Sequence, residues 1–182
     1  MQRVPYDEFS LFHENIAEYS LTASAQPEVQ RIAHQLGDGR TVSALKWGSA
    51  EPQMVFVHGG SQNAHTWDTV LLDLGVPALA IDLPGHGHSS WRDDAMYSPH
   101  SMAVDIAEVI ALHAASAKIV VGMSLGGLTS LALAGHAPHL VQELVLVDIT
   151  PGVNGDKAKA ILDFVNGPQA FASFDDLLKR TI

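Results

Sequence analysis

The chain has 182 residues and a mass of 19.4 kDa, which fits one ordinary domain with enough chain to bury a core. Hydrophobic residues make up 47% of it and charged residues 16%, so wholesale disorder is excluded. A formal charge of -10 argues against nucleic acid or an anionic membrane surface as a partner. The absence of cysteine excludes disulfides, thiolate metal sites and a cysteine nucleophile.

The amino-terminal sequence favours a cytoplasmic protein. Residues 1–5 lead to the acidic Asp7 and Glu8, which is not the basic-then-apolar order of a secretory signal. The most apolar stretch, residues 118–134, is interrupted by serines and glycines, so no segment is predicted to span a membrane. The lack of cysteine also fits a reducing compartment.

Residues 1–28 are expected to form an arm packed on the protein surface, because aromatic side chains are interspersed there among mostly acidic ones. Residues 29–36 and 41–47 then flank a Gly-Asp-Gly-Arg sequence, whose glycines supply the positive φ angles of a tight turn. These two segments are predicted to form an antiparallel hairpin.

The middle of the chain predicts a mostly parallel sheet flanked by helices. Short apolar runs alternate with longer segments of helical period, as in βαβ units. We expect strands over residues 54–58, 77–82, 118–122 and 142–148. We expect helices in the segment containing Trp67, Leu71 and Leu74, from an N-cap at Ser98 to about residue 115, and from Ser124 to a point before Pro138.

The alternation stops after Gly152. Residues 156–165 predict a helix, and the Gly-Pro pair at 167–168 predicts a break. A second helix is expected to start at Ser173, where the sequence resembles a capping box. We therefore expect an interrupted helix in this segment.

The sequence Gly-Met-Ser-Leu-Gly-Gly at residues 122–127 follows a predicted buried strand and opens a predicted helix. A tight turn at such a corner exposes the hydroxyl of Ser124 and requires small neighbours. The start of the helix also offers the free N–H of Leu125 where an oxyanion would form. These features predict a serine nucleophile.

A second loop, with the sequence His-Gly-Gly-Ser at residues 58–61, follows the first parallel strand. Because carboxyl ends of parallel strands meet at one edge of a sheet, this loop should lie near Ser124. Its glycines let backbone N–H groups approach a substrate, so Gly60 is the preferred second oxyanion donor and Ser61 the alternative. Met123 is expected to line the acyl pocket, and His58 to be structural while remaining able to bond near the substrate.

Three motifs together resemble the α/β-hydrolase superfamily, in its lid-bearing branch of esterases, carbon–carbon bond hydrolases and cofactor-free haloperoxidases. They are residues 58–60, the sequence Asp-Leu-Pro-Gly-His-Gly-His-Ser at 82–89, and residues 122–127. The resemblance implies an α/β-hydrolase fold, Ser124 as nucleophile, a small-molecule acyl substrate and no cofactor. It divides the chain into an amino-terminal arm (1–28), a core of six strands (29–150) and the beginning of a lid (151–182).

The resemblance also implies an acid and a histidine on loops after two further core strands, which this sequence lacks. His136 and His139 are expected at the opposite edge of the sheet from Ser124, so neither is a plausible base. Asp148 is a candidate acid, and the alternative is a loop aspartate that caps residues 149–151. The chain thus resembles the first half to two thirds of a hydrolase, with an incomplete triad and lid.

Several alternatives stay open or are set aside. A metal site among the loop histidines His58, His65, His86 and His88 is not favoured. Metal sites need supporting carboxylates, and the turn at residues 86–88 has only Asp82 nearby in sequence. No phosphate-binding fingerprint supports a nucleotide site. Beside an esterase, the sequence allows a cofactor-free perhydrolase, a carbon–carbon bond hydrolase, or a catalytically inert scaffold. An inert scaffold would bind partners or self-associate through an exposed sheet edge near residues 142–148.

Overall fold

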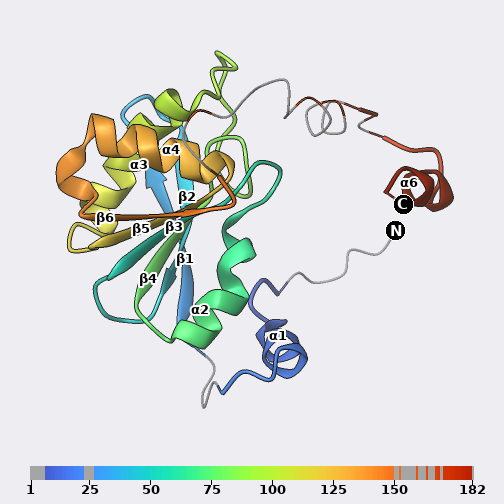
Figure 1. Cartoon of the computed structure of the whole chain (residues 1–182), viewed down its shortest axis with the longest axis horizontal. Coiled ribbons are helices and arrows are strands. Elements are labelled where there is room, and N and C mark those ends of the chain that lie inside the picture. The colour runs from blue at the N-terminus through green and yellow to red at the C-terminus, as the bar shows by residue number, and fades with distance from the viewer. Residues whose placement is uncertain are drawn as a thin grey trace. The chain divides into compact units, whose positions relative to one another are not determined.

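The structure is a computed structural model that describes residues 7–22, 27–149, 152, 159, 163, 167–168 and 170–181 (Figure 1). It divides into two compact units, Met1–Ile149 and Thr150–Ile182, and the sheet and the predicted site residues belong to the first. Its residues form no helix that is both long and apolar enough to cross a bilayer, within the ranges just given.

A six-stranded sheet with the order β1-β2-β4-β3-β5-β6 forms the centre of the first unit. The pairs β1–β2 and β2–β4 are antiparallel, whereas β4–β3, β3–β5 and β5–β6 are parallel. The predicted hairpin and mostly parallel sheet are therefore confirmed. The strands are β1 (Val29–Gln35), β2 (Thr41–Trp47), β3 (Met54–Val57), β4 (Ala78–Ile81), β5 (Ile119–Met123) and β6 (Glu143–Val147).

Helices cover both faces of this sheet (Figure 1). On one face lie α3 (Pro99–His113) and α4 (Leu125–His136), whose apolar side chains share a core cluster with residues of β2, β3 and β4. The other face is covered by α1 (Phe12–Glu18), the 3-10 helix η1 (Ala64–Trp67) and α2 (Asp68–Leu74). The central strand β4 is buried along its whole length, which explains its continuous apolar sequence.

Two helices of the first unit begin or end at the capping residue or proline that the sequence predicts. The hydroxyl of Ser98 accepts the N–H of Ser101 at 3.1 Å, as expected for the N-cap of α3. Helix α4 ends at His136, before the proline that begins the short 3-10 helix η2 (Pro138–Leu140). The predicted helical segment through Trp67 is present and begins as a 3-10 turn, and Leu74 at its end is 46% exposed.

The amino-terminal arm packs on the sheet through α1, a helix that the sequence reading did not identify. Phe12 is buried, and its ring centroid lies 5.1 Å from that of Trp47 at the end of β2. Phe9 extends the same contact, with its ring 5.9 Å from Phe12. The arm is thus anchored by aromatic packing on the face of the sheet that carries α2.

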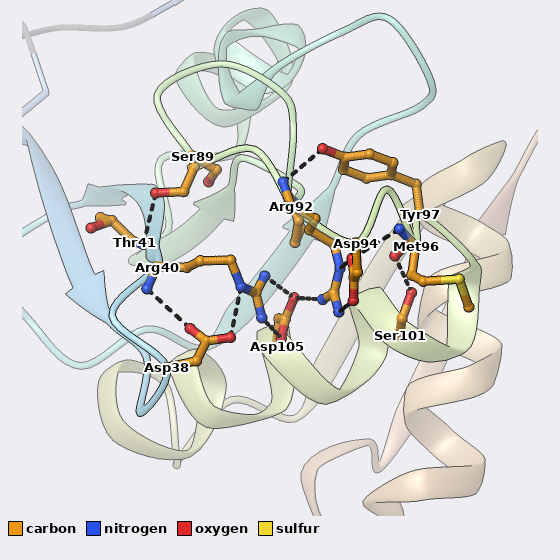
Figure 2. Close-up of polar contacts among 12 residues, drawn as sticks. Asp38, Arg40, Thr41, Ser89, Arg92, Asp94, Met96, Tyr97, Ser101 and Asp105 are labelled. Carbon is orange, nitrogen blue, oxygen red and sulfur yellow. Dashed lines mark hydrogen bonds and ion pairs between the residues drawn. The ribbon is translucent and has the colours of Figure 1, made fainter.

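A cluster of two arginines around Asp105 fastens two loops to α3 (Figure 2). Arg40, in the hairpin turn, donates two hydrogen bonds to the Asp105 carboxylate at 2.7 and 2.8 Å. Arg92, in the loop after β4, donates a third at 2.6 Å. Asp38 and Asp94 pair with the other guanidinium atoms, so both arginine charges are compensated.

The second unit contains α6 (Phe174–Thr181). The N–H of Asp176 donates to the hydroxyl of Ser173 at 3.2 Å, which confirms the predicted helix start. Gly167 and Pro168 lie in non-helical backbone, as expected of the predicted break. Most of the helix predicted over residues 156–165 lies outside the described residues.

Candidate active site

Ser124 lies at a sharp turn between β5 and α4. Its backbone has φ 49° and ψ -115°, a left-handed conformation that is strained for a residue other than glycine. The turn is held by the neighbouring strand, because the N–H of Ser124 donates to the carbonyl of Val147 in β6 at 3.1 Å. The carbonyl of Ser124 in turn accepts the N–H of Leu128 at 3.1 Å. The strand-to-helix corner predicted from residues 122–127 is present.

Two glycines make this turn sterically feasible. A Cβ added to Gly122 would lie 2.6 Å from the carbonyl oxygen of Gly126 and 2.7 Å from the hydroxyl of Ser130. A Cβ added to Gly126 would overlap the carbonyl oxygens of Val57 and His58. The first turn of α4 therefore packs directly on the backbone that leaves β3, with no room for a side chain.

This close packing brings the glycine loop at residues 58–61 beside Ser124. The Cβ position of Gly59 is 3.4 Å from the Cβ of Ser124, and that of Gly60 is 3.8 Å from a methyl group of Leu125. The structure thus places the loop at residues 58–61 beside the turn at Ser124, as predicted from the sequence. Ser61 follows with φ 61° and is exposed.

Some backbone N–H groups beside Ser124 have a hydrogen-bond acceptor in the described part of the protein and others do not. The N–H of Gly59 donates to Oε1 of Gln62 at 2.8 Å. Within the described ranges, the N–H groups of Gly60 and Leu125 have no protein acceptor. Gln62 was not singled out from the sequence, because nothing in its local pattern shows that its amide folds back on the loop.

His58 is fully buried and holds the start of this loop. Its Nε2 accepts the N–H of Leu83 at 3.0 Å, so the ring proton is on Nδ1, which donates to the carbonyl of Gly59 at 2.7 Å. Burial lowers the pKa of His58 from 6.5 to about 4, against the opposing effect of the Gly59 hydrogen bond. The ring is therefore neutral near pH 7, with both nitrogens occupied by backbone groups.

Asp82 holds the other end of the same loop. It follows β4, is fully buried, and accepts the N–H of Ala64 at 2.7 Å and that of His88 at 3.1 Å. Arg31 of β1 donates to the same carboxylate at 2.6 Å. Gly87 is required beside it, because an added Cβ would overlap the carboxylate. Asp82 was noted only as part of a motif, and its partner Arg31 was missed.

The other residues singled out from the sequence lie at separate places, and the described part of the chain shows no contact that joins them. Met123 ends β5 next to the nucleophile position and is half-buried. Asp148 is exposed after β6, with φ 53°, and the loop it was suggested to cap lies partly outside the described residues. His136 is exposed at the end of α4, and His139 is exposed in the following 3-10 helix η2. Among the residues that the structure describes, no histidine is hydrogen-bonded to Ser124, and no group of three acidic or histidine side chains forms a metal site.

The fold and this turn define an α/β hydrolase. The family model for the alpha/beta hydrolase fold matches residues 52–176, and the chain belongs to this family.

Individual relatives include several named esterases. The chain is 49% identical to the esterase Rv0045c of Mycobacterium tuberculosis over 97% of its own length and 59% of that protein. It is 41% identical to a pimeloyl-[acyl-carrier protein] methyl ester esterase of Nitrosomonas europaea, over 55% of the chain and 38% of the relative. The crystal structure of the M. tuberculosis esterase superposes with a TM-score of 0.80 at 48% identity, and the match covers 100% of this chain and 60% of that one. The chain thus spans about three fifths or less of these relatives.

The lowered pKa of His58 predicts a specific loss of stability in acid. Because the unfolded histidine binds a proton more readily than the folded one, its stabilising contribution is complete above pH 6.5 and falls as the pH drops toward 4. The full effect is about 3 kcal/mol, and about 2 kcal/mol is lost by pH 5. The difference in the free energy of unfolding between the unmodified protein and a His58→Gln variant should therefore fall by about 2 kcal/mol between pH 7 and pH 5.

Urea unfolding at the two pH values measures this difference. His139→Gln is the matched control, since His139 is exposed and has no place in the loop. If the unfolding free energy of His58→Gln depended on pH as that of the unmodified protein does, the neutral state of buried His58 would be contradicted.

Proposed function

We propose that this chain carries the nucleophile half of a serine esterase, which cleaves an ester or a similarly activated carbonyl through an acyl-Ser124 intermediate. The observation that carries the proposal is the strained turn at Ser124 beside the unclaimed N–H groups of Gly60 and Leu125. The named esterases among the relatives support the substrate class. A cytoplasmic location remains a prediction from the amino-terminal sequence and the lack of cysteine.

The proposed reaction is an acyl transfer in two steps. The hydroxyl oxygen of Ser124 attacks the carbonyl carbon, its proton passes to a base that later gives it to the leaving alcohol, and the carbonyl oxygen becomes an oxyanion. The N–H groups of Gly60 and Leu125 would stabilise that charge, with Ser61 as an alternative donor. The oxyanion then collapses, the alcohol leaves with a proton, and water releases the acid from the serine. Met123 would border the acyl group.

A base is the part of this mechanism that the described residues do not supply. His58 is neutral, but Leu83 and Gly59 occupy its nitrogens. The base must therefore reach Ser124 from residues other than those described beside it. Asp148 remains the proposed acid, because it lies at the carboxyl end of β6, the strand whose carbonyl holds Ser124.

The missing base favours a second candidate, an inert hydrolase scaffold that associates with other chains. This candidate is motivated by β6. Among the strands that the structure describes, β6 pairs with β5 alone, and Val145 in it is 45% exposed. A scaffold of this kind should self-associate through that edge. Sedimentation of the chain as a compact monomer at high concentration would contradict it.

Intact mass after treatment with a fluorophosphonate probe tests the proposed nucleophile. The unmodified chain should gain one probe adduct, and Ser124→Ala should gain none, because the phosphorus bonds to the activated serine oxygen. Ser116→Ala, in an exposed turn after α3, is the matched control and should label as the unmodified chain does. Labelling that persists in Ser124→Ala, or no labelling of the folded chain, would overturn the proposal.

A further inference from the structure

The glycine loop beside Ser124 is anchored at both ends to the segment that follows β4. At its start, His58 links to Leu83, and at its end the N–H of Ala64 donates to Asp82. Between these anchors lie Gly59 and Gly60, so the position of the Gly60 N–H depends on both. The Ala64 anchor is a hydrogen bond to the fully buried carboxylate of Asp82, so it holds the loop only while that carboxylate stays in place.

Arg31 compensates the buried charge of Asp82. Its Nη1 donates to Asp82 at 2.6 Å and to the hydroxyl of Ser43 at 2.5 Å. Its remaining donors, Nε and Nη2, point to one oxygen of Glu8, with the Nε bond at 2.7 Å. The guanidinium is therefore held between Asp82 of the core and Glu8 of the amino-terminal arm, with 16% of its side chain exposed.

Glu8 has a second cationic partner in His65, which follows Ala64 in η1. Nε2 of His65 lies 3.1 Å from Glu8, and Nδ1 lies 2.7 Å from Asp68. Both ring nitrogens face carboxylate oxygens, so both must carry protons for the two hydrogen bonds to form. The hydrogen bond with Asp68 raises the pKa of His65 despite burial, and Glu8 adds to this. The pKa of Glu8 is lowered, because hydrogen bonds from Arg31 and His65 outweigh burial.

We propose that Glu8 of the amino-terminal arm is a positioning residue for the oxyanion loop. It acts along two routes that meet at the end of that loop: through Arg31 and Asp82 to Ala64, and through His65 of η1. This inference rests on the proposed role of Gly60. It gives the arm a part in the reaction although Glu8 contacts neither the nucleophile nor its neighbours in the turn.

The physical reason lies in how Arg31 is held. Of the three carboxylates that face Arg31 and His65, which are Glu8, Asp68 and Asp82, Glu8 is the one that bonds to both cations. Without the Glu8 charge, two Arg31 donors and one His65 donor face at most a neutral amide oxygen, which binds them less strongly than a carboxylate does. The arginine can then turn toward solvent, which weakens its hold on Asp82 and leaves the Ala64 anchor less constrained.

Amide hydrogen exchange followed by NMR tests the coupling without requiring activity. In Glu8→Gln, a substitution that keeps the shape and removes the charge, the Ala64 amide should exchange about tenfold faster, while amides of the central β5 stay unchanged. Glu14→Gln, an exposed carboxylate of the same arm, is the matched control and should change neither. Unchanged exchange at Ala64, or equal acceleration throughout the core, would overturn the proposal.

The rate at which the probe labels Ser124 distinguishes a positioning role of Glu8 from a purely structural one. In Glu8→Gln the maximal labelling rate of Ser124 at saturating fluorophosphonate should fall about tenfold, with probe affinity and final adduct yield unchanged. A lower yield at an unchanged rate would mean that Glu8 only maintains the folded fraction and would overturn the positioning role. If no variant labels, the proposed function fails, while the exchange of the Ala64 amide still decides whether the arm holds the loop.

Discussion

The candidate site depends on one contact between two pieces of backbone. At Gly126 the first turn of α4 lies against the carbonyl oxygens of Val57 and His58, where no side chain fits. This contact sets the distance between the helix that carries Ser124 and the loop that carries Gly60. It also forces the chain to leave β5 abruptly, which produces the left-handed backbone at Ser124. The strain is tolerated because β5 is paired on both sides by parallel strands.

Two buried polar side chains hold the glycine loop in the position that this contact sets. His58 and Asp82 fix the two ends of the glycine loop to the segment after β4, and both are fully buried. His58 is neutral near pH 7 because burial lowers its pKa, and the carboxylate of Asp82 is paired with Arg31. The proposed coupling extends from these anchors through Arg31 and His65 to Glu8 in the amino-terminal arm.

The fold and the serine turn could be predicted from the sequence because their signals are local. Apolar runs marked the strands, and Gly122 and Gly126 around Ser124 marked the corner. The anchors could not be predicted in the same way. Arg31 and Asp82 are 51 residues apart, and Glu8 and Arg31 are 23 apart, so only the sheet topology brings them together. Helix α1, with seven residues, is too short to show a clear helical period, and its aromatic residues indicated only surface packing.

Alanine substitution at two glycines of α4 tests the central contact most directly. Both Gly126 and Gly135 lie in the helix, but a Cβ at Gly135 meets nothing within 4 Å. Gly135→Ala should raise the free energy of unfolding by about 0.5–1 kcal/mol, because alanine loses less backbone entropy. Gly126→Ala should lower it by about 2 kcal/mol or more, because the methyl group must displace backbone atoms of the β3 loop. Equal stabilisation by both substitutions in urea unfolding would contradict the account.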